Sequence, residues 1–466
     1  MPGGNIDKYP PYWAVPFSTF EGVTDFLREL DHACTLAGRP SDGTVDFQAV
    51  ADCLQALGRP DRRYRSVHVT GTNGKTTVSR MVAGLLKATG TRVGLYTSPH
   101  LLHFRERISI DGHPISEAAL VDACSHVKAY LDVRGLAGDR LSPFEFLTVA
   151  AFFAFAAAKV DYAVIEVGIG GAQDATNVVA PDLSIITNVD YDHMDLLGDR
   201  LEHIARAKSG IIKPMTPVVC GSMPEEARAV IMSRAAEIQA PLMLIDHDYD
   251  IPELCHSGME TLCSVRIGRR RWDRIVLSSP ASFMATNAAH ALTAYDILRR
   301  RGAIAPLCDE EVRTVFAATE FPASCELLPG SPTVLANGAH NGPAMAQLAS
   351  LLRRIFEGRR RVLVVSIERD KDSEVMIRHL AQTSADRIIF TRCPSGTTIE
   401  PGRLAASWRH VTHVAAEVLD SPEVALSRAC QAAAPDGLVV VTGSVQLAGL
   451  ARSTEPAMAL TPPLRP

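Results

Sequence analysis

A glycine-rich loop between a strand and a helix constrains the fold of this chain more than any other feature of its sequence. Residues 66–70 (SVHVT) alternate in polarity as a strand does, and apolar residues from Val78 to Leu86 recur at the spacing of one helix face. A second strand is expected at residues 92–98 (RVGLYTS). This order of strand, helix and strand over about 30 residues predicts a βαβ unit, and with it a parallel sheet.

The loop inside this unit, TGTNGKTT at residues 70–77, is a candidate phosphate-binding loop. Backbone N–H groups and the N-terminus of the following helix can point at phosphates from such a place. Lys75 is expected to contact the β- and γ-phosphates, and the hydroxyl of Thr76 or Thr77 to ligate Mg²⁺. The strict pattern needs a glycine at the position of Val69, so the loop is a variant; a plain glycine turn is the alternative that its context disfavours. The residues expected to contact the nucleotide here are Gly71, Thr72, Asn73, Gly74, Lys75, Thr76 and Thr77.

Strand-like and helix-like segments alternate through most of the remaining length. Up to about residue 300 we expect one nucleotide-binding-type sheet, with helices at 144–158, 200–208 and 287–298 and strands at 162–167 and 183–189. After a break at residues 299–306 (RRRGAIAP), strand-like segments return at 333–336, 362–367, 387–391 and 438–442. The sequence therefore predicts an α/β protein with a P-loop, parallel-sheet, ATPase-type N-terminal domain (residues 1–300) and a smaller Rossmann-like α/β C-terminal domain (residues 301–466).

Charge and composition exclude several classes of protein. The 466 residues carry a formal net charge of −5, which lacks the basic excess of a nucleic-acid binder, so we expect small-molecule partners. The most apolar stretch, residues 147–158, is too short to span a membrane, and the first residues show no secretory signal. The ten cysteines form no CxxC pair and are expected to be reduced and mostly buried. We expect a cytoplasmic protein, as a monomer or a small homo-oligomer.

Polar residues stand where several predicted strands end. Ser98 closes one strand, Glu166 closes another, and Asp192 and His193 follow a third. Because the carboxyl ends of parallel strands face one crevice, these side chains could converge on one ion beside the phosphates. Each residue taken alone is more often a cap or a solvated group, and the joint placement favours a metal site.

A series of short motifs, spread over nearly the whole chain, matches one family in the family's order. The motifs are Gly71–Lys75 (GTNGK), Tyr96–Leu101 (YTSPHL), Phe104–Ile108 (FRERI), Phe144–Thr148 (FEFLT), Glu166–Gly171 (EVGIGG), Asp174–Asn177 (DATN), Lys208–Lys213 (KSGIIK), Gly338–Asn341 (GAHN), Asp370–Asp372 (DKD) and Thr442–Ser444 (TGS). The chain thereby resembles the Mur ligase superfamily, and within it the folylpolyglutamate synthase/dihydrofolate synthase family.

The resemblance implies an ATP-dependent ligase in which a substrate carboxylate attacks the γ-phosphate and an amino-acid amine captures the acyl phosphate. It implies dihydropteroate or a reduced folate, with glutamate, as the substrates. It also implies one Mg²⁺ at the phosphate loop and a second held by Ser98, Glu166 and His193. Lys208 matches a lysine that is commonly carbamylated, which would replace an ammonium by an anionic ligand; an ordinary helix-end lysine is the alternative. By this resemblance the catalytic residues are Lys75, Lys208, His193 and His340, the metal ligands are Thr76, Thr77, Ser98, Glu166, His193 and Lys208, and further nucleotide contacts come from Asn287, Asn337 and His340.

The departures from the family pattern concentrate on the second half of the nucleotide site. Phe283 and Met284 stand where the family has a His-Gln pair, and Ser324 stands where it has an arginine that clamps phosphates. Asn337 replaces a family aspartate. An arginine clamp on a transferring phosphoryl group stabilises its transition state strongly, so another cation has to substitute in an active enzyme. Candidates by composition are Arg269–Arg271, Arg359–Arg361 and Arg369.

Three interpretations fit a chain that keeps the glycine-rich loop and the predicted metal ligands but departs from the family in the second half of the nucleotide site. The chain is a folate ligase whose missing contacts are supplied differently, a paralogue that joins an amino acid to another carboxylate, or a degenerate chain that binds without turnover. A regulatory or transport ATPase is disfavoured, because it would need an aspartate closing an apolar strand, whereas the strand at 162–167 carries Glu166 followed by glycines.

Overall fold

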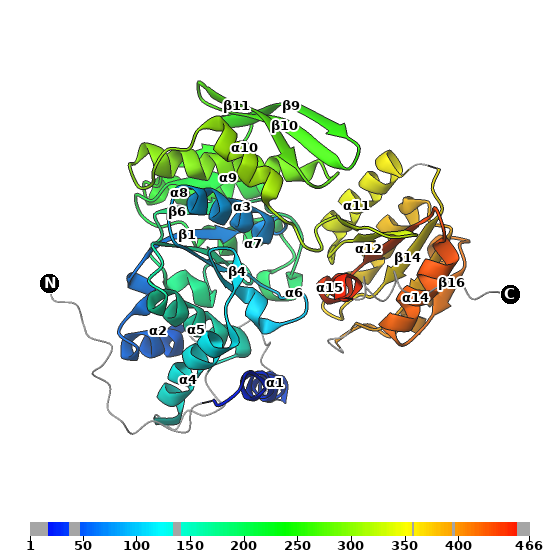
Figure 1. Ribbon diagram of the computed structural model, residues 1–466, viewed down its shortest axis with the longest axis horizontal. Helices are drawn as coiled ribbons and strands as arrows, with labels where there is room; N and C mark the ends of the chain where they lie inside the picture. Colours follow the sequence, from blue (N-terminus) through cyan, green and yellow to red (C-terminus); the bar gives the residue numbers. More distant parts are fainter. Residues whose placement is uncertain (1–16, 37–46, 134–140, 357, 394–396, 454–466) are drawn as a thin grey trace.

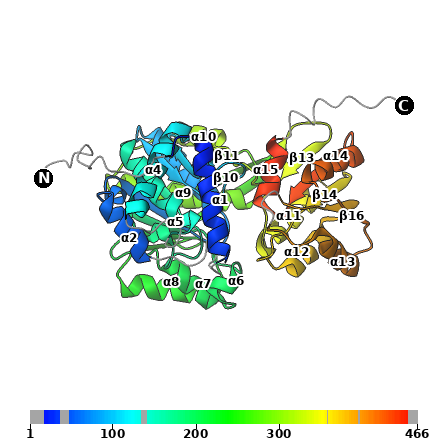
Figure 2. The ribbon, with the colours of Figure 1, turned by 90° about the horizontal axis from the view of Figure 1, so that it is seen from below.

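Two sheets organise the part of the chain that the computed structural model describes, which is residues 17–36, 47–133, 141–356, 358–393 and 397–453. The two sheets and their helices form two units that lie side by side (Figures 1 and 2). We call the unit around the first sheet the first unit and the other the second unit. A smaller three-stranded sheet belongs to the first unit.

The first sheet has eight strands in the order β4-β3-β2-β5-β1-β6-β7-β8. Its strands are parallel except for the edge pairs β2–β3 and β3–β4. The strands are β1 (Arg65–Thr70), β2 (Val93–Tyr96), β3 (Ile108–Ile110), β4 (His113–Pro114), β5 (Tyr162–Glu166), β6 (Leu183–Ile186), β7 (Val218–Cys220) and β8 (Leu242–Leu244). The glycine-rich loop leaves the central strand β1, so it lies at the middle of the sheet's carboxyl edge.

Side-chain alternation along the strands fixes which helices cover each face. Val164 packs in the apolar cluster of α3 and α9, whereas Ala163 and Ile165 pack in that of α4 and α5. The helices of this unit are α1 (Phe20–Leu36), α2 (Phe47–Ala56), η2 (Pro60–Arg62), α3 (Lys75–Ala88), η3 (Phe104–Arg107), α4 (Glu117–Val133), α5 (Pro143–Ala157), η4 (Ala175–Val178), α6 (Met194–Leu197), α7 (Leu201–Ser209), α8 (Glu225–Glu237), α9 (Phe283–Arg300) and α10 (Asp309–Ala318).

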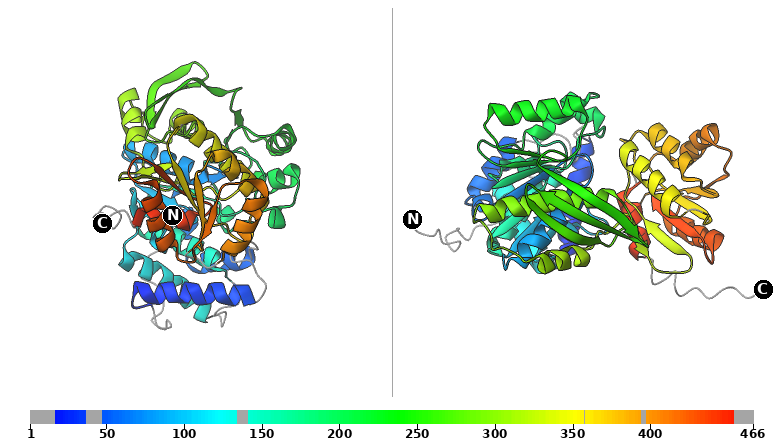
Figure 3. Two further views of the ribbon diagram at one scale, coloured as in Figure 1. Left: turned by 90° about the vertical axis from the view of Figure 1, so that its right-hand side faces the viewer. Right: turned by 90° about the horizontal axis from the view of Figure 1, so that it is seen from above.

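A three-stranded antiparallel sheet, which the sequence reasoning missed, stands beside α9. It consists of β9 (Tyr249–Ser257), β10 (Glu260–Ile267) and β11 (Arg270–Leu277) in the order β11-β10-β9. Its buried residues, such as Trp272 and Ile275, join the core cluster of α9. The far end of the β9–β10 hairpin extends toward the second unit (Figure 3).

The second sheet has six strands in the order β12-β13-β17-β14-β15-β16, all parallel except β12. Its strands are β12 (Glu326–Leu328), β13 (Thr333–Ala336), β14 (Arg361–Val365), β15 (Arg387–Phe390), β16 (Ala416–Val418) and β17 (Leu438–Thr442). Its helices are α11 (Gly342–Ile355), α12 (Ser373–Leu380), η5 (Ala381–Thr383), α13 (Pro401–Val411), α14 (Pro422–Ala433) and α15 (Val445–Ser453).

The predicted α/β class with two mainly parallel sheets is confirmed. The domain boundary at residue 300 stays a prediction; helix α10, which follows it, packs against α3 and β11 of the first unit. The apolar stretch at 147–158 lies in and just after the buried helix α5, as expected. No helix among the described residues is both long and apolar enough to cross a membrane. All ten cysteines are free thiols, and seven of them are buried.

Candidate functional site

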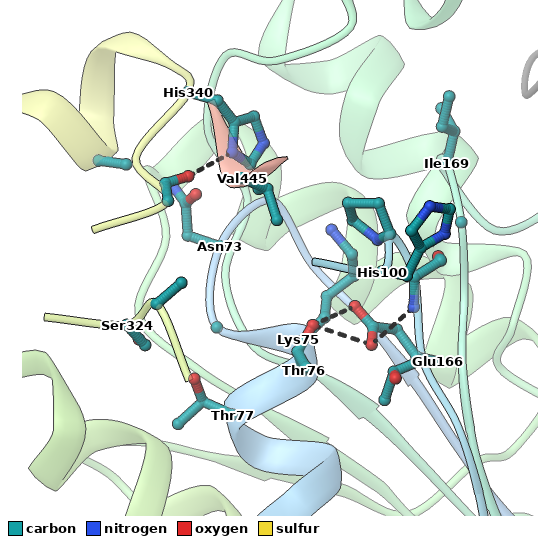
Figure 4. A pocket seen from close by; sticks show the side chains of 18 of the residues that line it. Asn73, Lys75, Thr76, Thr77, His100, Glu166, Ile169, Ser324, His340 and Val445 are labelled. Carbon is teal, nitrogen blue, oxygen red and sulfur yellow. Dashed lines mark hydrogen bonds between the residues drawn. The ribbon is translucent and has the colours of Figure 1, made fainter. Parts of the chain in front are cut away.

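A cleft of about 1750 Å³ lies between the two units and takes its lining from both. The first unit contributes the glycine-rich loop, the segment after β2, Glu166 and the start of α9. The second unit contributes residues 337–340 and 368–371, and the segment 321–324 joins the lining between them. Figure 4 shows the loop residues facing Glu166 on one side and Ser324 and His340 on the other.

The glycine-rich loop is held in shape by the segment that follows β6. The backbone N–H groups of Thr72 and Asn73 both donate to Asn188 Oδ1, at 3.0 and 2.9 Å. Gly74 has φ +83°, and a Cβ there would lie 2.6 Å from Asn287 Oδ1. A side chain at this position is therefore excluded by both the backbone and its neighbour. The loop is built to bring its backbone close to Asn287.

Lys75 begins α3 and lies folded over its own loop. Its Nζ donates to the carbonyl oxygens of Gly71 and Thr72, at 3.1 and 3.2 Å. These neutral acceptors hold the ammonium over the loop without neutralising its charge. The predicted phosphate-facing lysine is thus in the cleft, with its charge available to an anion.

Glu166 closes β5 beside β1 and is almost fully buried. Thr76 Oγ1 donates to both carboxylate oxygens, at 2.9 and 3.0 Å, and the backbone N–H of Ser98 donates at 3.4 Å (Figure 4). Burial raises the pKa of Glu166 to about 7, although Lys75 and Thr76 act in the opposite direction. A buried carboxylate, a threonine hydroxyl and a nearby serine are oxygen donors of the kind that Mg²⁺ prefers. The residues present therefore fit a magnesium ion.

The other predicted metal ligands are placed less directly. His193 has a left-handed backbone with φ 48°, and burial lowers its pKa to about 3. Lys208 on α7 is buried, and burial together with the neighbouring Lys75 lowers its pKa to about 7. In the described part of the chain, no ion pair within 4.0 Å involves Lys208, and no group of three or more His, Cys, Asp or Glu side chains could hold a metal. Thr76 and the Ser98 backbone contact Glu166, and the grouping of all six predicted ligands around metal ions stays a prediction.

The buried amide of Asn287 fits a nucleotide in the cleft. Its Nδ2 is buried and has no hydrogen-bond partner in the structure, while its Oδ1 lies against the glycine-rich loop at Gly74. A buried amide donor without a partner is costly unless something bonds to it. A ligand in the cleft beside the loop would supply the missing acceptor.

The second unit brings His340 and Asn337 to the cleft. His340 Nδ1 donates to the Gly338 carbonyl at 2.8 Å, which leaves Nε2 to accept a proton or a hydrogen bond. Asn337 donates through Nδ2 to Cys325 Sγ at 2.8 Å and accepts from the Ala339 backbone at 2.7 Å. Both ends of the Asn337 amide are therefore engaged within the protein.

Of the arginines proposed to replace the missing clamp, only Arg369 lines the cleft, among the residues that the structure describes there. Arg361 is buried and donates to the backbone carbonyls of Thr383 and Phe356. Arg271 pairs with Glu253 and Asp273 on the three-stranded sheet. The sequence reasoning missed two groups of the cleft, Arg80 one turn beyond Thr76 and the buried Lys371, although the DKD motif at 370–372 gave a signal for the second.

Comparisons with known proteins agree with this geometry. The family described as "Mur ligase middle domain" matches residues 69–237, and that described as "Mur ligase, glutamate ligase domain" matches residues 325–445. The chain is 33% identical to a folylpolyglutamate synthase of Lacticaseibacillus casei over 423 residues, which cover 88% of this chain and 94% of the relative. It is 35% identical to a dihydrofolate synthase/folylpolyglutamate synthase of Mycobacterium tuberculosis over 438 residues, covering 87% and 88%.

Solved structures give the same result at the level of the fold. The folylpolyglutamate synthase of Mycobacterium tuberculosis complexed with ADP superimposes with a TM-score of 0.84 at 31% identity, covering 93% of this chain and 98% of that one. An FPGS–AMPPCP–folate complex superimposes with a TM-score of 0.78 at 30% identity, covering 92% and 98%.

Proposed function

Because this chain belongs to the folylpolyglutamate synthase/dihydrofolate synthase family of the Mur ligases, we propose that it joins glutamate to a folate-type carboxylate at the expense of ATP. The family makes it an ATP-dependent acid–amino-acid ligase. The proposed carboxylate is dihydropteroate or a reduced folate, because relatives named for these activities span most of the chain. A relative in complex with both AMPPCP and folate supports the same substrates.

The observation that carries the proposal is the arrangement of Lys75, Thr76 and Glu166 at the base of a cleft between two units. A phosphoryl transfer needs cations and backbone donors around the phosphates rather than a covalent enzyme nucleophile. Lys75 and the N-terminus of α3 supply a positive charge and N–H groups at this place. The substrate carboxylate then attacks the γ-phosphorus with release of ADP, and the amine displaces phosphate from the acyl phosphate to form the amide.

We assign the metal sites to residues that the cleft brings near this loop. Thr76 or Thr77 would hold one Mg²⁺, and Ser98, Glu166 and His193 would hold a second. When bound, Mg²⁺ neutralises charge on the phosphates. Lys208 is proposed to be carbamylated, since its depressed pKa supports a neutral, nucleophilic amine at neutral pH, and a carbamate would remove a buried positive charge beside Lys75.

The second half of the nucleotide site is proposed to differ from the family pattern. Ser324, which stands where the family has an arginine, lies near the loop and carries no charge (Figure 4). We propose that Arg369 supplies the positive charge in place of that arginine. Asn287 and His340 are proposed to contact the nucleotide. The internal hydrogen bonds of Asn337 support a role for this residue in shaping the loop after β13.

These same differences favour a second candidate function, a ligase of this family that acts on another carboxylate. Changed contacts around Ser324 and Asn337 alter the site without removing Lys75, Thr76 or Glu166. The chemistry of phosphoryl transfer would then be retained while the substrates differ. A chain that binds without turnover is the remaining alternative.

Acceptor-dependent release of ADP from ATP tests the proposal. Purified protein is assayed with Mg²⁺, ATP and glutamate, with either dihydropteroate or tetrahydrofolate, and each substrate is left out in turn. Turnover that needs both the folate and glutamate is the expected result. Turnover only with other carboxylates or amino acids would establish the second candidate, and ATP binding without any turnover would establish the degenerate chain.

A further inference from the structure

One buried carboxylate of the first unit collects three side chains of the second. Asp192 follows β6, and its Oδ1 lies 3.1 Å from Lys371 Nζ. Its Oδ2 accepts from Asn341 Nδ2 at 2.9 Å and lies 3.9 Å from His340 Nε2. Lys371 follows β14, and Asn341 begins α11, so neither is near Asp192 in sequence.

The ion pair between Asp192 and Lys371 is shielded from water. Each of the two side chains is only 6% exposed. Burial alone would lower the pKa of Lys371, but Asp192 and the adjacent Asp370 raise it above its ordinary value. Removal of one partner of a buried pair leaves an uncompensated charge, so this contact is far more sensitive to substitution than a surface ion pair.

Asn341 links this ion pair to the phosphate loop. Its side chain exchanges two hydrogen bonds with Asn73 of the loop, at 3.1 and 3.4 Å, in addition to its bond to Asp192. Its Oδ1 also accepts from the backbone N–H of Ala344 and so caps α11. The loop, Asp192 and the N-terminus of α11 are therefore joined through one side chain.

Two histidines stand beside the same pair, one from each unit. His193 Nε2 lies 3.4 Å from Lys371 Nζ and 3.9 Å from Asp192 Oδ2. His340, on the opposite unit, is 3.9 Å from the same oxygen. If Lys371 left Asp192, both histidines would lose a charged neighbour, and the two units would lose a buried ion pair between them.

We propose that Asp192 and Lys371 are a positioning pair that holds the second unit over the glycine-rich loop and keeps His340 of the second unit and His193 of the first beside the same Asp192 oxygen. Asn341 couples this pair to the loop, because it bonds to both Asp192 and Asn73. We call the arrangement in which Asp192 contacts Lys371 the closed arrangement. By linkage, a nucleotide that orders the loop stabilises the closed arrangement, and the closed arrangement raises the affinity for the nucleotide by the same factor. The coupling rests on the proposed nucleotide site at this loop, whereas the closure itself does not.

The test combines small-angle scattering with calorimetric binding of AMPPCP and Mg²⁺, on wild type, Lys371→Met, Asp192→Asn and the double variant. We expect each single variant to have a larger radius of gyration than wild type when AMPPCP is bound. We expect AMPPCP affinity to fall by about 5- to 150-fold, the usual size of a coupling between sites. The double variant should bind AMPPCP no less tightly than the single variant with the lower affinity, because both substitutions break the same contact.

Lys128→Met is the matched control, because Lys128 also pairs with an aspartate, Asp132, but within α4. Lys128→Met should change neither the radius of gyration nor the AMPPCP affinity. Lys371→Arg keeps the positive charge, so its radius of gyration and its AMPPCP affinity should stay close to those of wild type. Circular dichroism checks that each variant folds. If the charge variants do not fold, Asn341→Ala tests the proposal instead, since it keeps both charges and removes the side chain that joins the pair to the loop. It should weaken AMPPCP binding. A Lys371→Met protein that compacts and binds AMPPCP as wild type does would overturn the proposal, even with turnover lost, because Lys371 would then act on a substrate.

These readouts separate the positioning pair from the ligase assignment. If the protein failed to turn over any carboxylate and amino acid, the scattering and calorimetry would still report on closure. If turnover were normal and Lys371→Met changed nothing, only the positioning pair would be wrong.

Discussion

At the scale of single residues, Lys75 is the side chain whose removal has the most direct consequence. Its Nζ donates to two backbone carbonyls of the loop, which are neutral acceptors and leave its positive charge available to a phosphate. Lys75→Ala should lower acceptor-dependent ADP release by at least about 100-fold, the loss expected for one group that stabilises transferring charge. Lys87→Ala, on the same helix, is the control, since Lys87 Nζ donates to the Asp111 carbonyl at the protein surface. Full ligase activity in Lys75→Ala would show that the loop is not the phosphate site.

Glu166 gives a prediction about pH in the absence of metal. Burial raises the pKa of Glu166 from 4.5 to about 7, so between these values the folded protein holds a proton that the unfolded chain has released. The free energy of unfolding therefore falls as pH rises through this range and stays lowered above it. With EDTA present, Glu166→Gln should be more stable than wild type by about 2 to 4 kcal/mol at pH 8 and show no such gain at pH 4.

Thermal and urea unfolding at the two pH values measure this difference, and Mg²⁺ supplies the internal control. Added Mg²⁺ should stabilise wild type at pH 8 and leave Glu166→Gln nearly unchanged, because the variant lacks the anionic ligand. An equal difference between the two proteins at pH 4 and pH 8 would show that the carboxylate does not titrate as its burial requires.

The sequence could predict the residues of the loop and its neighbours because each is fixed by a local pattern. Lys75 follows β1 through the glycine-rich loop, and Glu166 closes the adjacent parallel strand β5, so their proximity is a consequence of strand order. The contact between Asp192 and Lys371 could not be predicted in this way. It depends on how the two units pack against each other, and no periodicity within either unit encodes that packing.

At the scale of elements, α15 shows how closely the two units approach. Gly449 lies inside this helix, and a Cβ there would lie 2.9 Å from Leu101 Cβ and 2.9 Å from Leu101 O. Leu101 belongs to the first unit and packs against the apolar cluster of the second. In Figures 1 and 2, α15 lies on the side of the second unit that faces the first. The glycine is therefore required by the contact between units.

Gly449→Ala should lower the free energy of unfolding by about 1 to 3 kcal/mol, the usual cost of overpacking, although alanine is the better helix former. The matched control is Gly402→Ala in α13, where nothing lies within 4 Å of an added Cβ. That variant should gain up to about 1 kcal/mol from helix propensity. Urea unfolding of both proteins checks the pair. A stabilised Gly449→Ala protein would mean that α15 does not press on Leu101.

Prediction of the elements succeeded where burial makes the pattern simple. Strands such as β14 and β17 are buried along their whole length and read as continuous apolar runs. The antiparallel strands β9 to β11 were missed because much of β9 is exposed, and its mixed polar and apolar side chains do not form a simple alternating pattern. A signal was present in the glycines at 258 and 268, both with positive φ, which form the two hairpin turns.

At the scale of the whole molecule, the proposed function depends on two sheets whose carboxyl-end loops line one cleft. Neither unit holds all the residues of the proposed site, since Lys75 and Glu166 belong to the first unit and His340 and Lys371 belong to the second. The covalent connection after α10 and the contacts at Asp192, Leu101 and Arg354 set how the units meet. Arg354 of α11 donates to Ser282 Oγ and to the Pro280 carbonyl, both at 2.9 Å, at the start of α9.

This arrangement predicts where a bound nucleotide changes the dynamics of the protein. AMPPCP with Mg²⁺ should slow backbone hydrogen exchange in loops of both units, at residues 71–77 and 187–193 in the first and 337–341 in the second, because the ligand orders both walls of one cleft. The strand β11, residues 270–277, packs against α10 and should exchange as it does without ligand. Exchange measured by mass spectrometry resolves these segments. Protection confined to the first unit would mean that the nucleotide binds without engaging the second, and that the differences at Ser324 and Asn337 leave this chain with only half of a ligase site.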